Sequence, residues 1–199
     1  DILQNLSMAL LPILCFPDPR LNTVAKPVAA VDARIRTLCA DMIDTMRSAD
    51  GVGLAAQQVG VALQIAVVDV AEVEDRPSLM WIAGKEVDYR GFMPMVLLNP
   101  QLELGLEKEP GTEGCLSFPK INADINRAIK VRCIAQTLDG AVLDFEAAGF
   151  LARALQHEVD HLNGVLFIDR MSSAAKASVA GKIKRLQKST LKNTLINWR

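Results

Sequence analysis

The chain has 199 residues, half of them hydrophobic, and its 22 basic and 23 acidic residues give a formal net charge of −1. This length allows one domain with a sizeable core and leaves little room for a second. The sequence contains no run of eighteen apolar residues, which excludes an ordinary membrane-spanning helix. Its opening also lacks the basic flank and the cleavage pattern of a signal peptide. We therefore expect a cytoplasmic protein.

Positive charge is concentrated at the end of the chain. Residues 171–199 contain seven basic residues and no acidic one, which leaves 15 basic and 23 acidic residues, a net charge of −8, in residues 1–170. We expect residues 1–170 to form a single domain and residues 171–199 to form a basic tail. Because residue 1 is not methionine, Met8 is a candidate natural start, and residues 1–7 would then be upstream sequence.

The basic tail shows a partial helical pattern. Gly181 weakens the pattern, which rests on apolar residues at Val179, Ile183, Leu186 and Leu195. Two interpretations stay open. The tail is either a solvated terminal helix or a segment that docks on a polyanion such as RNA.

The pattern predicts a helix, then a series of strands, then a second helix. Asp139-Gly140 predicts a tight hairpin turn whose central residues have positive φ. Strands joined by hairpins ahead of a late helix predict an α+β fold, with antiparallel strands packed around a central helix and one helix near each end of the chain. The expected elements are a helix over 32–47, a loop over 51–60, strands over 63–70, 96–104, 128–137 and 141–146, and a helix over 150–162.

Both histidines of the chain lie on the last of these helices, four residues apart. Residues at that spacing share a helix face, so His157 and His161 can hold one metal ion while Glu158 borders the same site. The alternative, two histidines satisfied by hydrogen bonds in a core, gives Glu158 no reason to lie between them. Asp160 is either an orienting group for His157 or a surface residue.

The two sides of this helix differ in character. Leu155, Val159 and Leu162 form an apolar stripe that we expect to face the core. The histidine side also carries Phe150 and Ala154. Arg153 stands at the rim of that side, where it either contacts a polar main-chain group or is an exposed helix arginine.

A catalytic metal needs a third protein ligand and an open position. A metzincin protease would have histidine at position 167, which is Phe167 here, and a thermolysin-like protease would have a downstream glutamate, whereas Asp169 is the only carboxylate after His161. The third ligand is therefore expected upstream, and Cys115 is the best candidate. Thiolate softness suits Zn²⁺ or Fe²⁺ and excludes a Mg²⁺ or Ca²⁺ site. The other cysteines (Cys15, Cys39 and Cys133) are interpreted as small core hydrophobes rather than partners in disulfides.

Three segments, taken together, resemble the signature motifs of peptide deformylase in the family's order: Gly53–Gln58, Glu113–Ser117 and Gln156–His161. The opening Leu14–Leu21 is also similar to the family's, and the resemblance covers residues 8–170, with the type 1 bacterial branch as the nearest likeness. It implies a metallohydrolase that removes the N-formyl group from the N-terminal formyl-methionine of newly made polypeptides and releases formate.

Formamide hydrolysis needs a nucleophile, a proton shuttle and donors for the developing oxyanion. A metal held by the three expected ligands lowers the pKa of its bound water, which becomes the nucleophile. Glu158 is placed to act as general base and then general acid. The resemblance assigns the oxyanion to the Gln58 side-chain amide and the backbone N–H of Leu116. It also implies Fe²⁺ as the physiological metal, with Zn²⁺, Ni²⁺ or Co²⁺ able to occupy the site.

Substrate selection is expected to depend on an apolar pocket for methionine beside the metal. Val52, Phe150 and Ala154 are our candidates for its wall. Gly53 has no side chain and would let the substrate backbone approach closely. For the basic tail, the resemblance favours docking on the ribosome, where new chains emerge.

Two rival functions from other classes remain. Gly51, Gly53 and Ala56 imitate a dinucleotide-binding fingerprint, but that motif must follow a strand and open a full helix, whereas here a helix precedes it. A non-catalytic binding protein on the same fold is the second rival. An altered Glu158, Gln58 or Cys115 would have supported it, and all three are intact.

Overall fold

The computed structural model describes residues 10–196, with side chains described as far as Lys192. The predictions on Met8 and residues 1–7 fall outside this part of the chain, and nothing is described of the side chain of Leu195. None of the described helices is long and apolar enough to cross a membrane.

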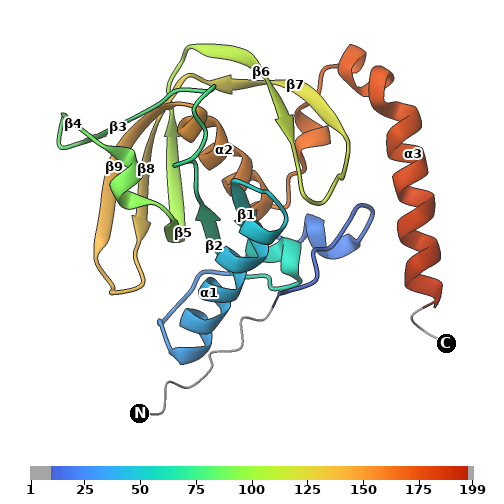
Figure 1. Cartoon of the computed structure of the whole chain (residues 1–199), viewed down its shortest axis with the longest axis horizontal. Helices are drawn as coiled ribbons and strands as arrows, with labels where there is room; N and C mark the ends of the chain where they lie inside the picture. Colours follow the sequence, from blue (N-terminus) through green and yellow to red (C-terminus); the bar gives the residue numbers. More distant parts are fainter. Residues whose placement is uncertain (1–9, 197–199) are drawn as a thin grey trace.

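The described chain forms three α-helices, nine strands and four short 3-10 helices (Figure 1). In chain order they are η1 (Pro19–Asn22), α1 (Ala33–Ser48), β1 (Gly53–Ala55), η2 (Ala56–Val59), β2 (Ile65–Val68), β3 (Ser78–Ile82), β4 (Lys85–Val87), η3 (Tyr89–Phe92), β5 (Met95–Leu104), β6 (Lys108–Gly114), β7 (Asn122–Ala128), β8 (Lys130–Gln136), β9 (Val142–Gly149), α2 (Phe150–Leu162), η4 (Phe167–Arg170) and α3 (Ser173–Ile196).

Seven strands form one sheet in the order β1-β2-β5-β8-β9-β3-β4, with every pairing antiparallel. β6 and β7 pair separately as a two-stranded hairpin. The register of β8 and β9 pairs Gln136 with Val142, which confirms the predicted hairpin at Asp139-Gly140. Gly140 has a φ of +86°, but Asp139 is not in the positive-φ region, so only one of the two central residues takes the expected conformation.

α2 lies at the centre of the molecule, against the large sheet and β7 of the β6–β7 hairpin, whereas α1 packs on β1 and β2 (Figure 1). The start of β3 fixes where the helix begins: the Phe150 N–H donates to the Pro77 carbonyl at 3.0 Å, and the Leu151 N–H donates to Ser78 Oγ at 3.0 Å. Gly149 permits this approach, because its φ is +69° and a Cβ there would overlap the Pro77 carbonyl. The helix that carries the histidines is therefore held rigidly at its first turn.

Both faces of α2 are covered, which overturns part of the sequence interpretation. Leu155 and Leu162 are buried as expected, but Val159 is partly exposed, and the histidine face is as buried as the apolar stripe. The reason is that the large sheet and the β6–β7 hairpin enclose the helix from different sides. Helical periodicity identifies a single buried face and could not anticipate a second layer.

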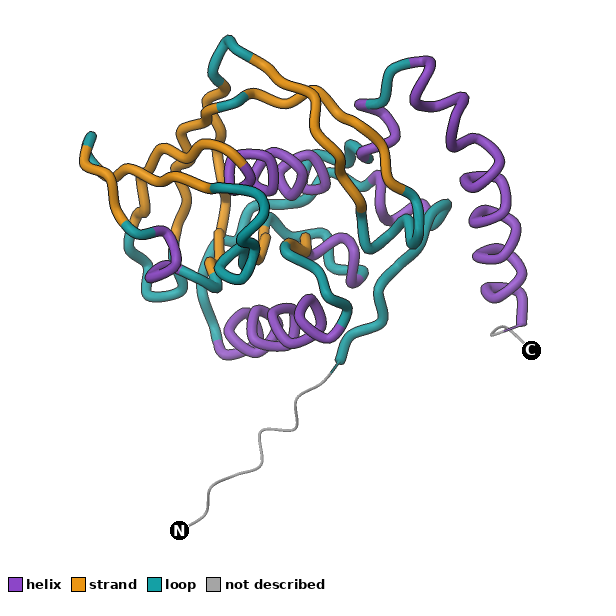
Figure 2. Tube along the Cα trace, turned by 45° about the horizontal axis from the view of Figure 1, so that its top comes forward, coloured by secondary structure: helices purple, strands orange, loops and turns teal. Residues whose placement is uncertain are grey.

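α1 and α3 are the other two helices expected from the sequence. The Asp32 side chain caps α1 by accepting from the Ile35 N–H at 2.9 Å, and the helix buries Cys39 against its side of the sheet. α3 runs along one edge of the molecule, away from α1 (Figure 2). All four cysteines are free thiols: Cys39 and Cys133 are buried as predicted, whereas Cys15 is only partly buried.

Candidate metal centre

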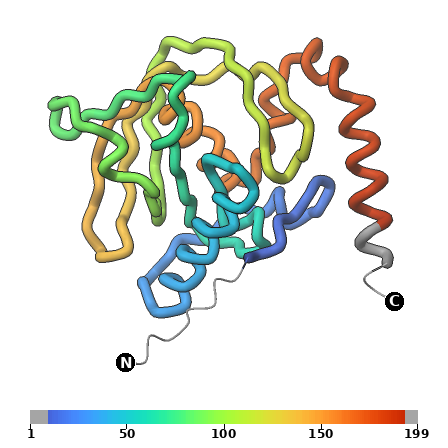
Figure 3. The backbone as a smooth tube through the Cα atoms, viewed as in Figure 1, coloured from blue at the N-terminus to red at the C-terminus, as the bar shows by residue number. Residues whose placement is uncertain are grey.

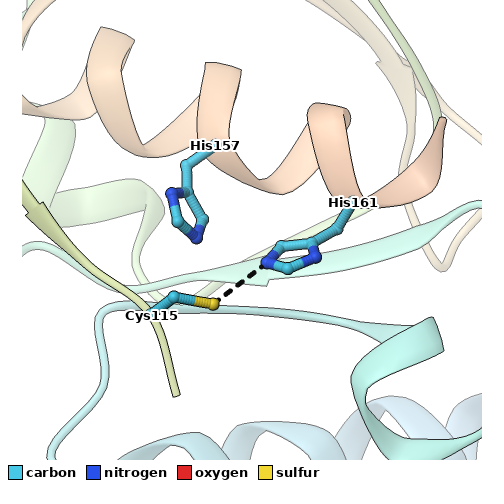
Figure 4. Close-up of side chains that lie close together, drawn as sticks. All are labelled: Cys115, His157 and His161. Carbon is cyan, nitrogen blue, oxygen red and sulfur yellow. Dashed lines mark hydrogen bonds between the residues drawn. The ribbon is translucent and has the colours of Figure 1, made fainter. Parts of the chain in front are cut away.

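The segments of the three motifs meet at the centre of the fold, although they are far apart in the sequence (Figure 3). His157 and His161 project from successive turns of α2, and Cys115 directly follows β6. One ligand atom from each residue lies within 4.8 Å of the others. Cys115 Sγ is 3.3 Å from His161 Nε2 (Figure 4). The three residues expected to hold a metal therefore converge on one point.

The histidine nearer the start of the motif is oriented for metal binding by a carboxylate. His157 Nδ1 lies 3.0 Å from Glu113 Oε2, so the ring directs its Nε2 toward Cys115 and His161 (Figure 4). Such carboxylate–histidine pairs fix the tautomer and the ring orientation of metal ligands. Two imidazole nitrogens and one thiolate make a donor set that suits Zn²⁺ or Fe²⁺. The residues present therefore fit a divalent metal ion.

Glu113 is the centre of a buried group of charges. Arg127 binds its carboxylate through two nitrogens, at 2.8 and 3.0 Å, and Arg153 adds a third contact at 3.0 Å. Burial favours the neutral acid, but the hydrogen bonds with His157 and Arg127 outweigh burial and lower the pKa of Glu113 to about 2. The carboxylate is therefore ionised and accepts a hydrogen bond from the Nδ1–H of His157.

Arg153 and Asp160, whose roles the sequence left open, both belong to this group. Arg153 is 5% exposed and donates to the main-chain oxygens of Glu109 and Ile125, so it is not an exposed helix arginine. Asp160 is buried and pairs with Arg127 and with Arg170. Asp160 does not contact His157 directly. It pairs with Arg127, which in turn pairs with Glu113, the residue that contacts His157.

Glu158 points into the same region from α2. Its side chain is buried, and its Oε2 has no hydrogen-bond partner among the described residues. Burial raises the pKa of Glu158 to about 7, so the carboxyl can both take up and release a proton near neutral pH. Gly53 leaves room for the Glu158 side chain, since a Cβ at position 53 would overlap Glu158 Oε1. That close approach to Glu158 was not expected from the sequence.

Gln58 presents its amide nitrogen to the cysteine. Its Oε1 accepts from the Ala55 N–H at 3.0 Å, which fixes the orientation of the amide. Nε2 then donates to Ser117 Oγ at 3.1 Å and lies 3.6 Å from Cys115 Sγ. The neighbouring Gln57 turns the other way and donates to the main-chain oxygen of His161 at 2.7 Å. The two adjacent glutamines therefore serve different parts of the site.

A cavity of about 440 Å³ opens beside these groups. Its wall contains Cys115, His157 and Glu158. The remaining residues expected at the site, His161 excepted, also line it: Gln58, Leu116, Val52, Gly53, Phe150 and Ala154.

Sequence reasoning gave no role to two residues of the site. A role for Glu113 could have been predicted, because Glu113 lies two residues before Cys115 within a recognised motif. Arg127 offered no local signal: it reaches Glu113 only because β6 and β7 pair as a hairpin. Its neighbours in the sequence form no pattern that distinguishes it from an exposed strand arginine.

A helix-borne histidine pair, an upstream cysteine and a buried glutamate at the wall of a cavity define a metal-dependent hydrolase. Comparison with known proteins identifies the family. The polypeptide deformylase family model matches residues 10–177. The chain belongs to that family.

Similar proteins agree with this assignment. The chain is 44% identical to a peptide deformylase of Acinetobacter baumannii over 90% of this chain and 93% of the relative, and 45% identical to one of Saccharophagus degradans over 89% and 94%. Its fold matches a plant peptide deformylase with a TM-score of 0.79 at 33% identity, covering 98% and 96% of the two chains. The peptide deformylase of Ehrlichia chaffeensis gives 0.78 at 36% identity over 92% and 99%.

The expected α+β fold and the expected family are thereby confirmed. The activity is removal of the N-formyl group from nascent peptides, with a metal site formed by Cys115, His157 and His161. The dinucleotide-binding alternative is excluded, since its glycines lie in β1 and in the turn before it and open no full helix.

Proposed function

We propose that Glu158 is the group that moves the proton while the formyl group is removed from an N-terminal formyl-methionine. Its buried carboxyl, with a pKa near 7, suits a group that first accepts a proton from the attacking water and then delivers it to the leaving amine nitrogen. When bound, the metal ion supplies Lewis-acid activation of that water. The unpartnered Oε2 at the cavity is the observation that carries this role.

The oxyanion is assigned to Gln58 Nε2 and to the backbone N–H of Leu116. The Ala55 N–H holds the amide of Gln58, and one N–H of Nε2 donates to Ser117 Oγ. The other N–H is directed toward Cys115 and is the donor for the charge that develops on the formyl oxygen. Leu116 follows Cys115 directly and lines the same cavity. Removing one donor of this kind typically costs about 10²–10³ in rate.

The methionine side chain is assigned to the apolar part of the cavity. Phe150 and Ala154 stand one helical turn apart at the start of α2 and line the cavity together with Val52. Gly53, beside them, leaves room both for the Glu158 carboxylate and for an approaching substrate backbone. Fe²⁺ is the proposed physiological metal, with Zn²⁺, Ni²⁺ or Co²⁺ as alternatives that the same donors accept.

The basic tail is proposed to dock on the ribosome in the cytoplasm, where formylated chains emerge. One stripe of α3, formed by Val179, Ile183 and Leu186, packs on the body of the protein. The basic residues lie off that stripe, are exposed and form no ion pair with the described part of the chain: Lys176, Lys182, Lys184, Arg185, Lys188 and Lys192. A free cationic face of this kind suits phosphate groups of RNA.

Replacing four of these residues (Lys182, Lys184, Arg185 and Lys188) by glutamine tests the docking. We expect weaker, less salt-sensitive co-sedimentation with ribosomes and unchanged activity on short peptides. Co-sedimentation equal to that of the wild type would contradict the docking proposal.

The experiment that tests the catalytic proposal measures formate release from a formyl-methionyl tripeptide, in the absence of oxygen and with Fe²⁺ supplied. Glu158→Gln should abolish turnover and keep the bound metal, since Glu158 is not among the three ligands. Glu107→Gln, an exposed residue of the same type, is the matched control. Loss of metal from Glu158→Gln would make Glu158 a ligand instead, and full turnover would remove it from the mechanism.

A further inference from the structure

The cavity beside the metal site contains an arginine that the proposed chemistry does not use. Arg76 lies in the loop between β2 and β3, and its guanidinium stacks on the Phe150 ring at 4.0 Å from the ring centroid. One of its nitrogens donates to the Thr112 main-chain oxygen at 3.1 Å. Phe150 and Thr112 line the cavity as Arg76 does, so the guanidinium lies on its wall.

The charge of Arg76 is not neutralised within the described protein. It forms no ion pair there, in contrast with the neighbouring Arg153, which is paired with Glu113. Burial and the charge of Arg153 lower the pKa of Arg76, and Asp75 and Glu113 only partly oppose them. The guanidinium is therefore a half-buried cation that would gain from a nearby anion.

The other charged groups of the wall do not provide that anion. Glu113 is bound to Arg127 and Arg153, and Glu158 is buried beneath Gly53. Lys120 and Asp50 are both exposed at the cavity, and neither forms an ion pair with a described residue. The mouth of the cavity is therefore not acidic, although residues 1–170 carry a net charge of −8.

We infer that Arg76 selects substrates, favouring formylated peptides with an acidic side chain at the second or third residue. This inference rests on the proposed function, in which the methionine lies against Phe150. Because the Arg76 guanidinium covers that ring, the residues that follow the methionine pass close to a cation with spare hydrogen-bond donors. A carboxylate there is attracted, and it can accept from guanidinium nitrogens that the Thr112 carbonyl does not occupy.

The test uses formyl-methionyl peptides with an amidated C-terminus, so that the only carboxylate is the side chain under study. Pairs of peptides differ by glutamate against glutamine at the second or the third residue. The readout is the ratio of kcat/KM for the glutamate peptide to that for the glutamine peptide, measured as formate release at low salt. We expect a ratio of about 2 to 10 at one of the two positions, reduced at high salt.

Variants assign the effect to a residue. Arg76→Met, which keeps the packing on Phe150, should bring the ratio to one, and Arg76→Glu should bring it below one. Arg90→Met changes an exposed arginine outside the cavity and should keep the wild-type ratio. A purely structural role for Arg76 would lower both rates together and leave the ratio as it was, which would overturn the inference.

Two further outcomes would also overturn it. A wild-type ratio near or below one at both positions would show that the cavity does not prefer acidic peptides. A ratio that persists in Arg76→Met but disappears in Lys120→Met would transfer the selection to Lys120. Formate release from the glutamine peptide tests the proposed function independently of the preference for acidic peptides. If neither peptide released formate, the proposed function and the inference on Arg76 would both be overturned.

Discussion

The side-chain amide of Gln57 donates to the main-chain oxygen of His161 at 2.7 Å and to that of Thr23 at 3.2 Å. Gln57 is 1% exposed and lies in η2, whereas His161 lies in the last turn of α2. The side-chain amide of Gln57 therefore connects η2 with Thr23 and with the last turn of α2, the metal-binding helix. Gln57 does not line the cavity beside the metal site, and it positions His161 through the main chain of α2.

Gln57→Leu should weaken both the fold and metal retention. The substitution removes a buried donor from two carbonyls, which typically costs about 1–3 kcal/mol of stability. Urea unfolding and the rate of metal transfer to a chelator measure the two effects. Gln101→Leu, at an exposed position of β5, is the control and should change neither. Unaltered metal transfer in Gln57→Leu would show that the amide is not needed to hold His161.

Gly53→Ala should reduce activity without removing the metal. Gly53 does not have a positive φ, so the substitution adds a Cβ without straining the backbone. That Cβ would displace the Glu158 carboxylate, and a displacement of about 1 Å can cost about 10² in rate. Metal analysis together with kcat/KM checks the expectation. Gly91→Ala, where a Cβ meets nothing within 4 Å, should behave as the wild type. An active Gly53→Ala enzyme would refute the crowding argument.

Stability should fall at alkaline pH because of two core thiols. Burial raises the pKa of Cys39 to about 11, and burial followed by the charge of Asp144 raises that of Cys133 to about 12. Above about pH 9 the unfolded chain loses thiol protons that the folded chain keeps, so the thiols' contribution is present below that pH and is lost as pH rises through 11 and 12.

Urea unfolding at pH 8 and pH 10 measures this loss. Lysine and tyrosine also titrate in the range, so the comparison is between the wild type and Cys39→Ala. The variant should be less stable at pH 8 but should lose less stability between the two pH values. An equal loss in both proteins would contradict the assignment to Cys39.

Removing the metal should destabilise the protein. The ligands join the end of β6 to α2, so a metal ion that binds only the folded state adds its binding free energy to stability. At a free Zn²⁺ concentration 100 times the dissociation constant, the gain should be about 2.7 kcal/mol. Urea unfolding of the chelated and the reconstituted protein gives the difference, which Cys115→Ser should largely abolish. Identical unfolding curves with and without metal would be inconsistent with this site.

The sequence predicted the elements whose pattern is strong and local. The helix expected over 32–47 is Ala33–Ser48, and the one expected over 150–162 is Phe150–Leu162. β6 was missed because Lys108–Gly114 contains proline and two glycines and few residues typical of strands. It exists as a strand because it pairs with β7 along its whole length. Such pairing is a tertiary property and leaves no periodic trace in the sequence.

The residues of the site also divide into those that the sequence predicts and those that it does not. The ligands and Glu158 could be named from the sequence, because their spacing on a helix and their motif context carry the chemistry. The supporting residues could not. Arg127 reaches Glu113 through a strand pairing, Arg76 reaches Phe150 from a loop, and Gln57 reaches the main chain of α2 from η2. Contacts between elements decide these roles.

The carboxylate that orients His157 is bound by two arginines, and this constrains how the sequence can change. A neutral residue in place of Glu113 would leave Arg153 as a buried positive charge without a counter-ion and Arg127 with Asp160 alone, and breaking a buried ion pair in this way typically costs more than the worth of the pair itself. Replacing Glu113 together with Arg153 removes one charge of each sign and should harm the fold less than replacing Glu113 alone. Positions 113, 127 and 153 are therefore expected to be inherited as a set, and each residue's tolerance of substitution depends on the other two.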